Sequence, residues 1–134
     1  MSKDIFSPAT LLPPAGYSHI AKVSRGTLVF IAGQVSSDAS GKLVGKGDFE
    51  TQVEQVFKNL NLAVEAAGVT MADIVKMNIY LVADVGPDEV PKLRAIRDRH
   101  VNTAKPPAST LVFVSRLARP GWLVEIEAVA AIDD

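Results

Sequence analysis

The sequence predicts a single α+β domain over residues 1–134, in which a mixed β-sheet carries two helices. Two observations predict it. The spacing of apolar residues changes along the chain, from three or four over 53–67, typical of a helix, to two over 74–82, typical of a half-buried strand. Pro- and Gly-rich turns separate these segments from further β-rich runs, in the order β-β-α-β-α-β-β. A chain of 134 residues buries roughly two-thirds of its unfolded surface, so one core without disulfides suffices.

The first elements are predicted from β-rich runs. Residues 20–24 and 27–35 flank the turn pair Arg25-Gly26, which predicts a β-hairpin. Leu28–Ala32 is apolar without alternation, and we expect it to be buried on both faces. Residues 36–47 are rich in Ser, Gly, Asp and Lys, which is the composition of a loop.

A helix and a strand follow this loop. Asp48 is a suitable N-cap and Gly68 a suitable terminator. Between them, apolar residues recur at helical intervals, at Val53, Phe57, Leu60, Val64 and Ala67. Residues 74–82 then alternate, and the strand places Lys76, Asn78 and Tyr80 on its polar face.

The last third of the chain predicts one helix and two strands. The helix is expected over residues 88–101, because Pro91 is tolerated only in a first turn. Strands are expected over 109–117 and 123–132, on either side of a turn at 119–121.

The expected packing leaves one sheet face without a cover. Both helices can pack on one face, while the other face stays partly apolar. An apolar sheet face on a small domain needs a cover, and association of several copies is the simplest one.

Composition and charge exclude several classes of function. The chain has no cysteine, so disulfides, thiolate catalysis and cysteine zinc sites are ruled out. The net charge is -1 and the charges are mixed, so nucleic acid is not an expected partner. No stretch is apolar enough to span a membrane, and the start does not resemble a signal peptide, which predicts a cytoplasmic protein without a membrane partner. No phosphate loop or metal-binding motif is present, so no cofactor or metal is expected.

Two carboxylates near the end of the chain are candidates for acid–base chemistry. Glu125 and Glu127 are two residues apart, and a strand places both on one face. They are either an acid–base pair or cross-strand partners of basic residues, with Lys76 and Arg116 as the candidates.

Two further segments carry groups that could line a site. Tyr17 follows Gly16 on an irregular segment, where it either leans over a cleft or packs with its hydroxyl in water. His19 lies nearby. In Ala32–Gln34, Gly33 either lets a ligand approach the backbone or marks a bulge.

Basic residues cluster on the second predicted helix, at Lys92, Arg94, Arg97 and Arg99. We interpret the cluster as a solvated helix face rather than an anion site.

Several of these motifs together resemble one family. They are Gly16-Tyr17, Ala32-Gly33-Gln34, Glu65-Ala66-Ala67-Gly68 with Asp73-Ile74-Val75-Lys76, Pro107-Ala108, and Glu125-Ile126-Glu127-Ala128. In this order and spacing they resemble the YjgF/RidA family of reactive-intermediate (enamine/imine) deaminases, also labelled endoribonuclease L-PSP. The resemblance covers nearly the whole chain. It implies a chorismate-mutase-like α+β fold that forms a barrel-like homotrimer, with small-molecule clefts between subunits.

The resemblance also implies roles for individual residues. The tyrosine and glutamate near the imine and the attacking water match Tyr17 and Glu125. The arginine that holds the substrate carboxylate is replaced by Ser109, and the serine that helps it is replaced by Ala32. The implied substrate-binding positions are Ala32, Gly33, Gln34, Ser109, Thr110 and Leu111.

The serine at position 109 changes the expected substrate. A serine hydroxyl offers one neutral hydrogen bond where arginine offers a charged fork, so we expect a neutral or differently charged imine or enamine. A charged substrate could still be held if Arg97, Arg99 or Arg116 turned into the cleft.

The alternative function is a trimeric binding or chaperone-like module that uses the cleft without turnover. Ribonuclease activity follows only from the family's older label, and the absence of a basic patch argues against it.

Overall fold

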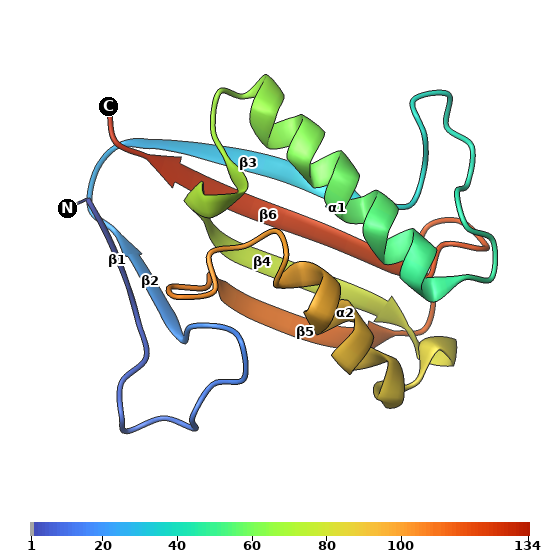
Figure 1. Ribbon diagram of the computed structural model, residues 1–134, viewed down its shortest axis with the longest axis horizontal. Coiled ribbons are helices and arrows are strands. Elements are labelled where there is room, and N and C mark those ends of the chain that lie inside the picture. The colour runs from blue at the N-terminus through green and yellow to red at the C-terminus, as the bar shows by residue number, and fades with distance from the viewer. Residues whose placement is uncertain (1) are drawn as a thin grey trace.

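A four-stranded mixed sheet carries both helices on one of its faces (Figure 1). The computed structural model describes residues 2–134. From edge to edge, the strands of the sheet are β3 (Thr27–Gln34), β6 (Val124–Ile132), β4 (Ile74–Val82) and β5 (Ala108–Val114). The helices are α1 (Phe49–Ala66) and α2 (Val90–Arg97), so the predicted α+β class is confirmed.

Strand β6 lies between its two neighbours and runs antiparallel to both. Its register sets Glu125 beside Tyr80 of β4 and Val129 beside Phe30 of β3. Strand β5 runs parallel to β4, because the chain crosses over through α2 before it returns to the sheet. In the resulting strand order, β3 and β5 form the two opposite edges of the sheet.

The predicted hairpin over 20–35 is wrong. Strand β2 (Ile20–Val23) pairs with β1 (Lys3–Phe6), for which no strand was expected, in a separate two-stranded sheet. Gly26, with φ +112°, redirects the chain between β2 and β3. The eight-residue strand β3 then pairs with the long apolar β6, which buries more surface than the four-residue β2 offers.

Helix α2 is shorter than predicted, and two short 3₁₀ turns come before it. The 3₁₀ turns η2 (Ala83–Val85) and η3 (Pro87–Glu89) precede it, and Pro91 lies in its first turn as expected. A third, η1 (Met71–Asp73), leads into β4. Strand β5 ends before the predicted residue 117, and it pairs with β4.

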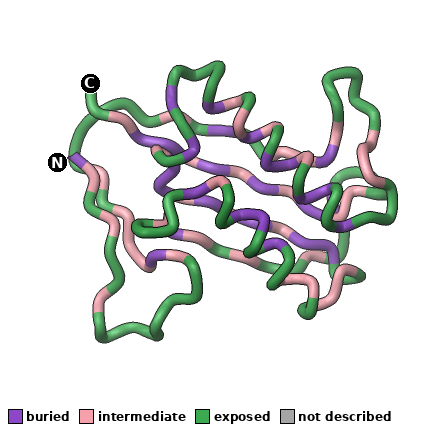
Figure 2. The backbone as a smooth tube through the Cα atoms, in the orientation of Figure 1, coloured by how far each residue is buried: buried purple, intermediate pink, exposed green. Residues whose placement is uncertain are grey.

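Helix α1 and strand β4 match their predictions closely. Asp48 Oδ1 accepts a hydrogen bond of 3.1 Å from the Thr51 N–H at the N-cap, and Gly68, with φ +76°, follows the helix. The inner faces of α1 and the sheet form the core (Figure 2), whose largest fully buried side chains include Phe57, Leu60, Met77, Ile79, Leu81 and Ile126.

The sheet face away from the helices, here called the open face, is uncovered in the single chain. Phe30 is 75 % exposed, and Leu28 and Val112 are also exposed. The expectation that Leu28–Ala32 is buried on both faces is therefore wrong for the single chain, since only Ile31 in it is buried, on the helix side. Within residues 2–134, neither helix has the length and apolar character needed to cross a membrane.

Candidate functional site

The largest group of predicted site residues lines one cavity of about 450 Å³, here called the α2 cavity. It lies between residues 15–19, here called the N-terminal segment, helix α2 and edge strand β5. Its polar lining comes from Tyr17, His19, Arg94, Arg97, Ser109 and Thr110. Leu111, Ile79 and Val90 supply apolar wall.

Local backbone pairing holds Tyr17 at this cavity. The neighbouring Ser18 forms a parallel bridge with Ala108, and its N–H donates to the Pro107 carbonyl at 3.1 Å. Tyr17 and His19, on either side of Ser18, and Ser109, which follows Ala108, all line the cavity. His19 contacts the Tyr17 ring edge-on, with 5.3 Å between the ring centroids. Of the two interpretations of Tyr17, the lining of a cleft agrees with the structure.

Arg97 corrects the interpretation of the basic cluster as a solvated face. Its side chain is only 6 % exposed, because it lies beneath the N-terminal segment. Gly16, with φ +77°, packs directly against the guanidinium, and any side chain at position 16 would collide with it. Arg97 Nε and Nη2 donate to Asp98 Oδ1 at 3.1 and 3.0 Å.

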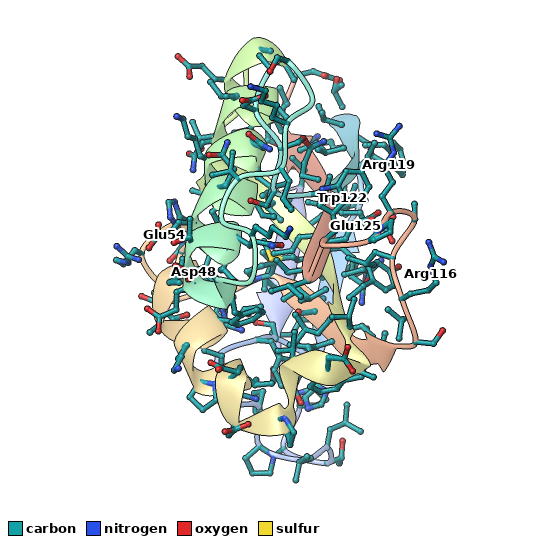
Figure 3. All side chains as sticks on the ribbon, turned by 90° about the vertical axis from the view of Figure 1, so that its right-hand side faces the viewer. Asp48, Glu54, Arg116, Arg119, Trp122 and Glu125 are labelled. Atoms are coloured by element: carbon teal, nitrogen blue, oxygen red, sulfur yellow. The ribbon has the colours of Figure 1, made fainter. Side chains whose placement is uncertain are left out.

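The other arginines divide clearly by position. Arg94 also lines the α2 cavity. Arg99 instead pairs with Glu54 on the outside of the helices. Arg116 donates to the carbonyls of Leu117 and Ala118 at 3.1 and 3.3 Å, far from α2 (Figure 3). Of the three arginines expected as candidates to replace the missing cation, Arg97 alone lines the cavity.

The second group of predicted residues lies on the open face, where Glu125 and Glu127 share one side of β6 as predicted. The Tyr80 hydroxyl donates to Glu127 Oε1, and this hydrogen bond, followed by burial, raises the pKa of Tyr80. Within residues 2–134, neither Lys76 nor Arg116 forms an ion pair with the two glutamates. Lys76 Nζ instead donates to Thr110 Oγ1 at 2.9 Å. The cross-strand ion-pair alternative is therefore wrong.

Glu125 lies against the backbone of Gly33. The register of β3 on β6 shifts between Ile31 and Gln34, so Gly33 sits at a bulge, and a side chain there would collide with the Glu125 carboxylate. The interpretation of Gly33 as a bulge is thus confirmed, and the approach of a ligand to its backbone stays a prediction. Burial, and then the charge of Glu127, raise the pKa of Glu125. The Gln34 amide folds back to donate to the Ala32 carbonyl at 3.0 Å.

A smaller cavity of about 340 Å³ opens beside these carboxylates, on the open face. Ala32, Lys76, Asn78 and Glu127 are among the residues that line it. Asn78 and Tyr80 were not predicted as site residues. Their place on the polar face of residues 74–82 was visible in the sequence, but the register that sets them opposite the glutamates was not.

A single chain does not bring the two groups together. Tyr17 and Ser109 lie at the β5 edge on the helix side, and Gly33 lies at the β3 edge. Figure 3 shows Glu125 on the side of the sheet away from α1, which carries Glu54. Among residues 2–134, no three His, Asp or Glu side chains gather as metal ligands would.

Comparison with known proteins agrees with the fold. The profile of the family described as Endoribonuclease L-PSP matches residues 8–132. A RutC family protein of Pyrococcus horikoshii is 35 % identical over 97 % of this chain and 98 % of its own length. A 2-iminobutanoate/2-iminopropanoate deaminase of Dermatophagoides farinae is 28 % identical over 96 % of this chain and 95 % of its own length.

A solved structure gives the same result. The crystal structure of a conserved Rid family protein from Yersinia pestis superposes with a TM-score of 0.87 and 34 % identity, over 98 % of this chain and 100 % of that one. The chain therefore belongs to the endoribonuclease L-PSP family, whose members also carry the names RutC, YjgF and Rid.

Proposed function

We propose that this protein is a hydrolase that converts a reactive imine or enamine into a carbonyl compound and ammonium, in a cleft between two copies of the chain. Glu125 is the general base and Tyr17 shapes the cleft. The substrate is one whose binding does not depend on a guanidinium at position 109. The name of the mite relative, an imine deaminase, supports this reaction class.

The observation that carries the proposal is the state of Glu125. Its carboxylate is half-buried, it has no ion-pair partner among residues 2–134, and burial together with Glu127 raises its pKa. A carboxylate whose pKa is raised toward the working pH is a better proton acceptor than a solvated one. A structural carboxylate would instead be expected to have a basic partner.

The proposed reaction needs one proton carrier. Water oxygen bonds to the carbon of the protonated imine, the π electrons move to nitrogen, and Glu125 takes a water proton. The carboxylic acid returns that proton to the amine nitrogen. The C–N bond then breaks as the hydroxyl oxygen forms the carbonyl, and Glu125 takes the hydroxyl proton and passes it to the departing ammonia. The carbonyl compound and ammonium leave, and Glu125 is ionised again. Backbone N–H groups near Gly33 are the proposed donors to the substrate, beside the Glu125 carboxylate that lies against Gly33.

Assembly completes the proposed site. The β3-edge group with Glu125 and the β5-edge group with Tyr17 lie apart in one chain, and contact between the β3 edge of one copy and the β5 edge of the next would join them. Such a heterologous contact closes into a ring, and a homotrimer is the ring we propose. The exposed apolar residues of the open face support it, since assembly would cover them.

A direct assay tests the proposal. The purified protein is incubated with 2-iminobutanoate, which a dehydratase generates in situ from threonine, and separately with a panel of neutral imines. The release of ammonium is measured in each case. We expect turnover of at least one substrate and its loss in Glu125→Gln. Glu65→Gln, on the exposed side of α1, is the matched control and keeps the activity. Full activity in Glu125→Gln contradicts the proposal, and binding without turnover across the panel favours the binding module.

Mixing two inactive variants tests the shared cleft. Glu125→Gln removes the base from the β3-edge group, and Tyr17→Ala removes the tyrosine from the β5-edge group. When equal amounts of the two variants are refolded together, about a quarter of the clefts combine an intact Glu125 from one copy with an intact Tyr17 from the next. We expect activity to return to about that fraction. Mixed oligomers that stay inactive would place both groups in one chain's own site.

A further inference from the structure

We propose that the α2 cavity binds a carboxylate group through Arg97 and Arg94, so that the cation for an anionic ligand comes from helix α2 instead of strand position 109. The ligand class is a small carboxylic acid with a short aliphatic chain, for which 2-oxobutanoate serves as the probe. Catalytic use of this ligand rests on the proposed function, but its binding does not.

The unused donors of Arg97 carry the inference. A guanidinium has five N–H donors. Within residues 2–134, its hydrogen bonds are the two to Asp98 Oδ1, from Nε and Nη2. The Asp98 side chain is 47 % exposed, whereas that of Arg97 is 6 % exposed. A buried cation is costly unless its donors are satisfied, and both Nη1 donors lack a protein acceptor at the cavity.

The net positive charge of the cavity lining also supports the binding of an anion. Two arginines line it, and no Asp or Glu is among its lining residues. Asp98 offsets one of these charges at most. Arg94 has no ion-pair partner among residues 2–134, although it lies one turn from Arg97 on the same helix. An anion that enters the cavity therefore meets an excess positive charge.

The rest of the wall selects the shape of the ligand. Ser109 and Tyr17 offer neutral hydroxyl donors. Thr110 turns its hydroxyl to the open face, where Oγ1 accepts from Lys76, so it adds no donor for the ligand. Leu111 and Ile79 form an apolar side. A carboxylate at the arginines with a short alkyl group against this side fits the arrangement, and a phosphate ester of a sugar would leave the apolar wall without contact.

Gly16 ties the arginine to the cavity. Its positive φ and lack of a side chain let the N-terminal segment lie directly on the guanidinium, which keeps Arg97 from turning out into solvent. The fork is thus held in place before a ligand arrives, which lowers the entropy lost on binding.

Binding of 2-oxobutanoate to the full-length protein, measured by isothermal titration calorimetry, tests the inference without any turnover. We expect saturable binding, and binding of the neutral 2-butanone at least roughly tenfold weaker, since a charge-assisted hydrogen bond contributes about 10- to 100-fold. Arg97→Met should weaken 2-oxobutanoate binding by about that factor, and Arg94→Gln by a smaller one. Arg99→Gln, two residues after the end of α2, is the matched control and should bind normally, because Arg99 pairs with Glu54 outside the cavity.

One additional variant, together with Arg94→Gln, keeps the test decisive. Arg97→Lys retains the charge without the fork, and Arg94→Gln changes an exposed side chain that the fold does not need. If both bind 2-oxobutanoate as the wild type does, or if 2-butanone binds equally well, the inference is wrong. Binding retained in Glu125→Gln, with ammonium release lost, supports both proposals. If the protein turns over its substrate and substitutions of Arg94 and Arg97 change neither binding nor turnover, this inference is wrong and the proposed function stands.

Discussion

Glu125 and Glu127 have similar positions on β6 but different partners. Glu127 accepts a hydrogen bond from Tyr80, whereas Glu125 faces the bare backbone of Gly33. The charge of Glu127 adds to burial in raising the pKa of Glu125. We therefore propose that Glu125 transfers the proton. Glu127 acts through Glu125, because its charge raises the pKa of Glu125.

This assignment predicts the pH dependence of Glu127→Gln. Glu125 works as a base when ionised, so kcat/KM falls as the pH falls through its raised pKa. Removing the Glu127 charge lowers the pKa of Glu125, and the acidic limb of the profile should move to lower pH. A pH series of ammonium release measures it, with Glu65→Gln as the unaffected control. A limb that stays in place, or moves to higher pH, contradicts the assignment.

The sequence predicted the shared face of the glutamates, because strand alternation is local. It did not predict the burial of Arg97, because the residue that covers it, Gly16, is distant in the chain. For the same reason, the serine at position 109 made Arg97 a candidate cation together with Arg99 and Arg116, but no pattern indicated which of them lines the cavity. Residue types and faces could be derived from the sequence, but contacts between remote segments could not.

Among the elements, helix α1 is tied to two loops by one buried side chain. Gln52 is fully buried, and its Nε2 donates to the carbonyls of Gly45 and Gly121 at 3.1 and 2.9 Å. Its Oε1 accepts from the Leu123 N–H at 2.9 Å. This side chain joins the loop before α1 to the turn before β6.

Gln52→Leu should therefore destabilise the protein although it removes no apolar contact. Three backbone groups lose their partners, and each buried unsatisfied group costs about 1–3 kcal/mol. We expect a loss of at least about 2 kcal/mol in the free energy of unfolding, measured by urea denaturation. Lys58→Leu, on the exposed side of the same helix, should change it by about 0.5 kcal/mol or less. An equally small change for Gln52→Leu would show that water replaces the lost partners.

Elements with a strong local pattern were predicted well, and pairings were not. Strand β4 begins and ends where the alternation does, and α1 begins at its cap. The predicted hairpin of β2 and β3 is wrong because a short turn permits two strands to pair but does not require it. Each strand pairs instead with the partner that buries more surface, β2 with β1 and β3 with β6.

At the scale of the whole molecule, the open face decides how copies associate. Phe30 and Leu28 project from β3, and Val112 from the other edge of the sheet. Polar residues lie between them, at Asn78, Tyr80, Glu125 and Glu127. An interface on this face would be apolar at its margins and would enclose the polar groups.

Phe30→Asp should prevent this assembly. A carboxylate in place of a 75 % exposed ring leaves the fold of one chain intact but puts a charge into the interface. Multi-angle light scattering should report three chains for the wild type and one for the variant. Leu62→Asp replaces an apolar residue that is similarly exposed, on α1, and should remain trimeric. A wild type that is already monomeric would rule out the shared cleft.

The central position of β6 also bears on how the protein is made. Strands β3 and β4 are both paired to β6, which follows them in the chain, so on the ribosome the sheet cannot close until β6 has been synthesised. At typical translation rates, on the order of 5–20 s separate the synthesis of β3 from that of its partner. During this interval the nascent chain exposes unpaired strand edges to other chains and to chaperones. Yield in a cell should thus depend on translation speed and chaperone supply more strongly than the stability of the finished protein suggests.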